Sequence, residues 1–350
     1  MTPIYITSNT RFSGKTFVSI GLAMKLREMG WDVGYMKPIG KTPVKHGRDV
    51  FDADAVFVKE ILDLEEPLDI ISPFVMTFET QSRMLKGKAP LAKKRIMAAF
   101  HSLKKKDFVV INGSGSLFEG ALLGINVLSV MDAMNARVLI IEPWRGEFSA
   151  DSLFGVRGVI GKRFSGAVIN KVPDDVMAYV KESLGPFLEK KGVKLYAAIQ
   201  RDRLLEAVTV RRLNEILGGR VLCCEDRLES LVENFSIGAM DVDSALAYFR
   251  RIPNKAVITG AHRSDIQLAA METSTRCIIL TGGLPTNNVV IGKAKSKNIP
   301  IISTQDDTFT AIDRIEAYAG STSIRERAKV ERARELFSTE FDIKRFLKGL

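Results

Sequence analysis

The sequence has few cysteines and no long hydrophobic run, and both shortages exclude classes of protein. Its three cysteines, of which Cys223 and Cys224 are adjacent, form neither a disulfide framework nor a zinc-binding pattern, which favours a reducing, cytoplasmic setting. Apolar runs such as Val138–Ile141 and Cys277–Leu280 are far shorter than the roughly 18–20 residues that span a bilayer. No charged and then apolar segment follows Met1, so we expect neither a secretory signal nor a membrane partner.

Histidines are also scarce, which bears on catalysis. The three histidines, His46, His101 and His262, are widely separated in the sequence, and no Gly-x-Ser-x-Gly segment is present. Neither a metal triad nor a hydrolase triad is therefore indicated.

Acidic residues are outnumbered by basic ones, 41 against 51, which gives a net charge of +10. Two basic runs, Lys93–Arg95 and Lys104–Lys106, fall on one predicted helix over residues 90–106. They lack the aromatic or glycine-rich platforms of nucleic-acid binders, so we interpret them as a solvated helix face and expect no nucleic-acid partner. A basic surface also suits small anionic ligands such as nucleotides.

The 350 residues are enough for two domains, and the pattern changes near residue 205. Before that point, β-branched strands alternate with helices, which is typical of a parallel sheet covered on both faces. The strands are expected at Ile4–Thr7, Val33–Lys37, Phe108–Asn112, Val138–Glu142, Gly166–Asn170 and Lys194–Ile199. The helices include Thr16–Met29, Asp52–Leu62 and Val176–Lys191.

A second, smaller α/β series follows the polar segment Arg201–Arg212. Its strands are expected at Arg220–Cys223, Ala256–Thr259, Cys277–Thr281 and Pro300–Ser303, and its helices at Asp265–Thr273, Asn288–Ser296 and Thr308–Tyr318. A basic amphipathic helix, about Ser323–Leu336, comes last. We therefore expect an α/β fold with domains at 1–204 and 205–320 and a C-terminal helix in 321–350.

The strongest local motif follows the first strand, where a loop leads into a helix. A Walker A loop has this setting: backbone N–H groups wrap phosphates, a lysine neutralises charge and a hydroxyl reaches Mg²⁺. Ser8 or Asn9 stands where that motif has its first glycine, and both residue types tolerate turns. The pattern predicts a nucleotide-binding loop of Thr10, Arg11, Phe12, Ser13, Gly14, Lys15 and Thr16. An inert turn that caps the helix is the alternative.

Four further segments resemble landmarks of the dethiobiotin synthetase family, in the same order and at similar spacing. They are Gly34-Tyr35-Met36-Lys37-Pro38-Ile39, Asp52-Ala53-Asp54-Ala55, Val109-Val110-Ile111-Asn112-Gly113-Ser114-Gly115-Ser116 and Ala167-Val168-Ile169-Asn170-Lys171-Val172-Pro173. The resemblance implies a P-loop NTPase domain that binds ATP and Mg²⁺. In such a domain Thr16 and Asp54 would hold Mg²⁺, and Lys15 would bind the β- and γ-phosphates.

The same resemblance implies roles for three more residues. Asn170, with Pro173 close behind it, would contact the adenine edge, and Lys37 would serve catalysis beside the phosphate or the acid being activated. Asn112 stands where the family has a glutamate, and the loss of a charged ligand should weaken Mg²⁺ binding and slow phosphoryl transfer. The alternatives are structural: Lys37 as a strand end, Asp54 as a helix-start charge and Asn170 as a turn former.

The second half resembles the DRTGG domain. Two strands lead to His262-Arg263-Ser264-Asp265 and to Thr281-Gly282-Gly283, with His262 where the family has aspartate. Glycine-containing strand ends can form anion-binding nests. A second ligand site is therefore expected at Arg263, Asp265, Thr281, Gly282 and Gly283. The alternative is that Asp265 only caps the helix that follows.

The order of the two domains resembles the non-catalytic N-terminal part of long bacterial phosphate acetyltransferases, and the first is also similar to cobyrinic acid a,c-diamide synthases. These resemblances favour a cytoplasmic, ATP- and Mg²⁺-binding regulatory or sensor protein without phosphate acetyltransferase activity. We expect a homo-oligomer, assembled through residues after about 210, and an unidentified protein partner. The alternatives are an ATP-dependent ligase that activates a carboxylate or carbamate, and a scaffold that has lost nucleotide binding.

Overall fold

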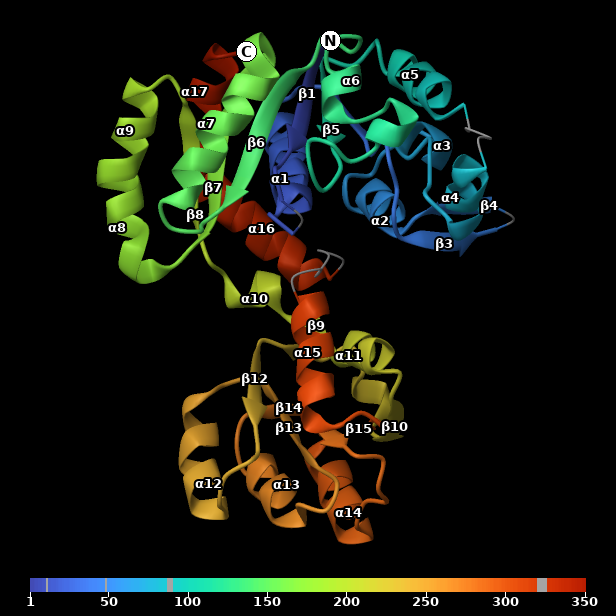
Figure 1. Ribbon diagram of the computed structural model, residues 1–350, viewed down its shortest axis with the longest axis vertical. Helices are drawn as coiled ribbons and strands as arrows, with labels where there is room; N and C mark the ends of the chain where they lie inside the picture. The colour runs from blue at the N-terminus through green and yellow to red at the C-terminus, as the bar shows by residue number, and fades with distance from the viewer. Residues whose placement is uncertain (11, 48, 87–90, 320–325) are drawn as a thin grey trace. The chain divides into compact units, whose positions relative to one another are not determined.

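The computed structural model describes residues 1–10, 12–47, 49–86, 91–319 and 326–350, which form two compact units (Figure 1). The first unit contains Met1–Arg201 and Ser323–Leu350, and the second contains Asp202–Thr322. The segment expected to stand apart at 321–350 thus belongs, from Ser323 onward, to the first unit. Among the described residues, no helix has the length and apolar character that a membrane span requires.

A six-stranded sheet is the centre of the first unit, with strand order β2-β5-β1-β6-β7-β8. Every neighbouring pair is parallel, and the strands are buried almost throughout. The predicted parallel sheet with apolar strands is therefore confirmed. The strands are β1 (Thr2–Thr7), β2 (Val33–Met36), β5 (Phe108–Asn112), β6 (Arg137–Pro143), β7 (Phe164–Val172) and β8 (Leu195–Gln200).

The first unit departs from the sequence-based expectation at two places. A hairpin of two short strands, β3 (Pro43–His46) and β4 (Asp49–Asp52), precedes α2. The single helix expected at Val176–Lys191 is interrupted by a π-helical turn, because Pro186 has no N–H to donate into the preceding turn. The helices are α1 (Lys15–Glu28), α2 (Ala53–Ile61), α3 (Leu68–Ile71), α4 (Phe78–Leu85), α5 (Ala92–Ser102), α6 (Val127–Val130), α7 (Phe148–Ile160), α8 (Met177–Tyr179), α9 (Gly185–Lys190), α16 (Arg327–Glu340) and α17 (Ile343–Lys348).

The C-terminal helix α16 packs along α1, the helix that follows the predicted loop (Figure 1). Gly21 of α1 makes this approach possible, since a Cβ at that position would lie 2.6 Å from Cγ of Phe337. Phe337 stacks on Phe341, whose ring centroid is 4.4 Å away, and Phe341 and Phe346 pack against Tyr196 of β8. The C-terminal segment is therefore part of the core of the first unit.

The second unit is a smaller α/β layer with strand order β10-β15-β14-β13-β12, in which only β10 is antiparallel to its neighbour. This confirms the predicted second α/β domain. The strands are β10 (Arg220–Cys223), β12 (Asn234–Ile237), β13 (Lys255–Gly260), β14 (Thr275–Thr281) and β15 (Ile301–Ser303), beside a short pair, β9 (Val208–Thr209) and β11 (Leu231–Val232). The helices are α10 (Arg203–Glu206), α11 (Val210–Leu217), α12 (Val242–Arg251), α13 (Ser264–Met271), α14 (Asn288–Lys297) and α15 (Thr308–Ala319).

Candidate functional site

The predicted loop lies between β1 and the start of α1, and the residue just before this helix must be glycine. Gly14 precedes α1 with a φ of 92°, in the left-handed region that favours glycine. A Cβ there would lie 2.1 Å from Nδ2 of Asn170. That Nδ2 atom donates a hydrogen bond to the Ser13 carbonyl oxygen at 2.9 Å. Asn170 of β7 thus fixes the loop backbone, a role distinct from the base contact implied by the family resemblance.

The Lys15 ammonium turns back into the loop, where it donates to Oγ of Ser8 at 2.9 Å and to Oγ of Ser13 at 3.3 Å. Burial, followed by repulsion from Lys41 and Lys37, lowers the pKa of Lys15 to about 8, and attraction to Glu119 offsets only part of this. A partly buried cation held by neutral hydroxyls is well suited to receive an anionic ligand.

Several of the remaining predicted site residues of the first unit make few contacts that define a role. Thr10 accepts a hydrogen bond from the Ser8 hydroxyl at its carbonyl oxygen, and Phe12 has a φ of 58° and an exposed side chain. Arg11 lies outside the described residues. Pro173 follows the last residue of β7, on the strand that carries Asn170.

Lys37, just after β2, forms a buried ion-pair cluster with two aspartates. Its Nζ lies 2.7 Å from a carboxylate oxygen of Asp52 and 2.7 Å from one of Asp54. Burial alone would lower the pKa of Lys37, but the two carboxylates raise it above its ordinary value, so the group is a cation. Lys37 is therefore buried, which argues against the alternative that it is only a strand end at the surface.

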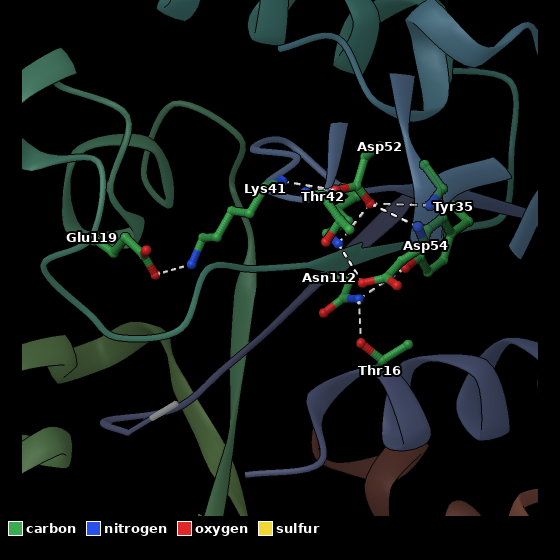
Figure 2. A network of polar contacts seen from close by, with 10 residues as sticks. Thr16, Tyr35, Lys41, Thr42, Asp52, Asp54, Asn112 and Glu119 are labelled. Atoms are coloured by element: carbon green, nitrogen blue, oxygen red, sulfur yellow. Dashed lines mark hydrogen bonds and ion pairs between the residues drawn. The ribbon is translucent and has the colours of Figure 1, made fainter. Parts of the chain in front are cut away.

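Asp52 organises this cluster and was not among the predicted site residues. Its fully buried carboxylate accepts hydrogen bonds from four backbone N–H groups, those of Lys41, Thr42, Asp54 and Ala55 (Figure 2). It thereby caps α2 and closes the β3–β4 hairpin. The segment was recognised in the sequence, but only contacts from Lys37 and Lys41, distant in sequence, reveal the importance of Asp52.

Asn112, at the end of β5, lies between Thr16 and the two aspartates in Figure 2. Its Nδ2 atom donates to Oγ1 of Thr16 at 3.2 Å and to the Tyr35 hydroxyl at 2.9 Å. Burial, together with the charges of Asp54 and Asp52, raises the pKa of Tyr35, although the contact with Asn112 acts in the opposite direction. The Tyr35 phenol is therefore neutral, and the Asn112 amide stands where the family resemblance implies a glutamate.

The donor atoms around Asn112 fit a weak Mg²⁺ site. Thr16 offers a hydroxyl oxygen and Asp54 a carboxylate oxygen, and Mg²⁺ uses one or two such groups together with phosphate oxygens. Lys37 competes for Asp54, and the Asn112 amide already donates to Thr16. The part of the chain that the structure describes contains no group of three or more His, Cys, Asp or Glu side chains able to hold a metal.

A second buried carboxylate, Glu142, was missed by the sequence analysis. It lies near the end of β6, the strand beside β1, and is fully buried. Arg145 and Ser152 donate to its two oxygens, and Asn9 of the loop donates to Oγ of Ser152 at 3.4 Å. Burial raises the pKa of Glu142 despite the neighbouring Arg145. The sequence did contain one indication of this site, because Glu142 is an acidic residue at the end of an otherwise apolar predicted strand.

In the second unit, the residues of the predicted ligand site are bonded to the chain itself. The Arg263 guanidinium contacts both Asp265 carboxylate oxygens, at 3.1 and 3.0 Å, and the Met240 carbonyl. The N–H groups of Gly282 and Gly283 donate to the carbonyls of Asp306 and Thr304, and the Thr281 hydroxyl contacts Thr308. Asp265 does not cap α13, which begins one residue earlier, at Ser264. These strand ends do not form an open anion nest.

Comparison with known protein families assigns both units. Residues 2–213 match the family described as an AAA domain, and residues 212–318 match the DRTGG domain. The two resemblances recognised in the sequence are thereby confirmed.

Among curated relatives, the chain is 24% identical over 367 aligned residues to a phosphate acetyltransferase of Synechocystis sp., covering 99% of this chain and 51% of that protein. It is 32% identical over 121 residues to an ATP-dependent dethiobiotin synthetase BioD of Methanocaldococcus jannaschii, covering 33% of this chain and 53% of that protein. The chain therefore spans about half the length of these relatives.

A solved structure similar to part of this chain is that of the CBS and DRTGG domains of the regulatory region of Clostridium perfringens pyrophosphatase, complexed with the activator diadenosine tetraphosphate. It is 19% identical, with a TM-score of 0.31, and the match covers 46% of this chain and 75% of that one.

Proposed function

This chain belongs to the AAA domain family through residues 2–213 and carries a DRTGG domain at residues 212–318, and on that premise we propose that it is a regulatory protein that binds ATP. The observation that carries the proposal is the Lys15 ammonium, partly buried and held by two serine hydroxyls at the start of α1. Phosphates would exchange these neutral partners for charged ones, with added attraction from the helix N-terminus.

We also propose that Mg²⁺ binds weakly together with the nucleotide. Thr16 and Asp54 would hold it, and it would neutralise phosphate charge. Lys37 would then release Asp54 and contact a phosphate, while Asp52 keeps the loop after β2 in place through its backbone contacts. The Asn112 amide, where a carboxylate would bind the ion more tightly, favours binding of the nucleotide over its turnover.

A thermal-shift panel of ATP, ADP and GTP, with and without Mg²⁺, tests the proposal. ATP at 100 times its Kd should stabilise the protein by about 2.7 kcal/mol. The Lys15→Ala variant should show a clearly smaller shift, whereas Lys25→Ala, a change of the same kind at a half-exposed position later in α1, should behave like the wild type. Absence of a shift with every nucleotide would leave the scaffold alternative.

A ligase is the second candidate, and one observation favours it. A cavity of about 260 Å³ has Phe51, the residue before Asp52, in its lining. Two arginines, Arg83 and Arg95, line it together with two acidic residues, Asp69 and Glu79. Such arginines could bind the carboxylate of a substrate. Release of ADP that accelerates on addition of small carboxylic acids would support the ligase, and a rate indifferent to them would support the regulator.

We further propose a cellular compartment and partners for the protein. The three free cysteines, Cys223, Cys224 and Cys277, suit a reducing cytoplasm. We expect a homo-oligomer and an unidentified protein partner. We expect no transfer of acetyl groups between coenzyme A and phosphate, which a direct assay of acetyl-phosphate formation would test.

A further inference from the structure

We propose that a cavity beside Arg220 in the second unit binds a small aliphatic metabolite through its carboxylate or phosphoryl group. The cavity lies where β14 and β15 end and β10 begins, and its volume is about 360 Å³, within the range of small-molecule sites. It is lined by Gly218, Gly219, Arg220, Leu222, Gly283, Leu284, Pro285, Thr286, Ser303 and Gln305.

Arg220, whose side chain is exposed, is the only charged residue among the described residues of this lining. Its guanidinium has no hydrogen-bond or ion-pair partner in the described part of the chain, in contrast to Arg263, which is paired with Asp265. The nearest acidic residue in sequence to the lining, Asp306, pairs with Arg314 at 3.1 Å. The cavity therefore presents one uncompensated positive charge, which would bind one carboxylate or phosphoryl group in a fork geometry.

Two buried polar atoms, one in the lining and one behind it, have no hydrogen-bond partner within the described ranges. One is Oγ1 of Thr286, which belongs to the lining. The other is Oδ1 of Asn214, which would lie 3.0 Å from a Cβ at Gly219, another lining residue. A buried polar atom left unpaired is destabilising, and a ligand hydroxyl group that bonds to Thr286 would remove this penalty.

Glycines at two corners shape the cavity. A Cβ at Gly219 would lie 2.7 Å from Ile302, and Gly283 has a φ of 64°, so larger residues would displace the lining. These positions allow the turn before β10 and the turn after β14 to approach the end of β15 closely.

The lining also limits the class of ligand. It contains no aromatic residue that could stack on a nucleobase, and its apolar part consists of Leu222, Leu284 and Pro285. A sugar phosphate or an aliphatic hydroxy acid fits this chemistry better than a nucleotide. The proposal does not depend on nucleotide binding in the first unit, so either can fail without the other.

Calorimetric titration of the full chain tests the proposal with four probes: ribose 5-phosphate, gluconate, ribose and AMP. We expect ribose 5-phosphate or gluconate to bind, which separates a phosphoryl from a carboxylate ligand, and ribose to bind far more weakly. Arg220→Gln should weaken the affinity for the anion that binds by about tenfold or more, which corresponds to at least 1.4 kcal/mol of binding free energy.

The matched control is Arg250→Gln, which should leave the affinity for the anion unchanged. Arg250 is an exposed arginine of α12, the helix that follows β12 at the opposite edge of the sheet. Three results would each overturn the proposal: no binding of either anion at millimolar concentration, tight binding of AMP alone, or loss of affinity in Arg263→Gln instead of Arg220→Gln. Circular dichroism of each variant shows whether it is folded.

Discussion

At the scale of single residues, the candidate site depends on the protonation of Lys15. Its pKa is lowered to about 8 by burial and by neighbouring cations, so the unliganded ammonium loses its proton in mildly alkaline solution. ATP binds the charged form, hence apparent affinity should be constant below pH 8 and fall up to about tenfold per pH unit above it. Calorimetry in buffers of different ionisation enthalpy should also reveal proton uptake on binding. A flat profile to pH 10 would contradict this, and Lys15→Arg, which stays charged, should remove the dependence.

Asn112 determines how much the site gains from Mg²⁺. Asn112→Glu would place a carboxylate beside the Thr16 hydroxyl, where the amide now donates. We expect ATP affinity in Mg²⁺ to rise relative to affinity in EDTA, because Mg²⁺ prefers charged oxygen ligands. Asn112→Gln, which keeps the amide, should not change this ratio. An unchanged ratio in a folded Asn112→Glu variant would mean that this residue does not face the metal.

At the scale of elements, the packing of α16 against α1 joins the C-terminal segment to the first helix of the first unit. Phe337→Ala should destabilise the protein by about 3–5 kcal/mol, the usual range for a buried phenylalanine. Phe309→Ala, at a side chain that is 78% exposed, serves as the control and should change the free energy of unfolding little. Denaturant titration measures both. Equal effects of the two substitutions would refute the packing role of α16.

The sequence predicted the strands of the first sheet, four of the five strands of the second and the loop, because these are local signals: apolar β-branched runs and a Gly-Lys-Thr segment at a helix start. It did not predict the edge strand β12. It did not predict the hairpin β3–β4, whose first strand is exposed and carries no apolar alternation. The pairing of Lys37 with Asp52 and the place of Glu142 beside the loop depend on strand order and on loop geometry, which no local pattern encodes. For the same reason, the contact between Gly21 and Phe337 and the lack of a partner for Arg220 could not be predicted from the sequence.

At the scale of the whole molecule, the second unit is inserted between β8 and α16 of the first. A chain ending near Gln200 would therefore lack the helices that cover α1 and β8, so it is unsuitable for testing assembly. We expect the full chain to be a dimer in light scattering at micromolar concentration, since closed dimers are the commonest assembly. A monomer mass under these conditions would contradict the expected homo-oligomer.

We propose above that the loop before α1 binds ATP through Lys15. Isothermal titration of ATP and Mg²⁺ into the full chain, its Lys15→Ala variant and its Lys25→Ala variant tests this most directly. We expect Lys15→Ala to weaken ATP binding tenfold or more, equivalent to about 1.4 kcal/mol, and Lys25→Ala to leave it unchanged. Equal affinity in all three proteins, or no binding to the wild-type chain, would contradict it.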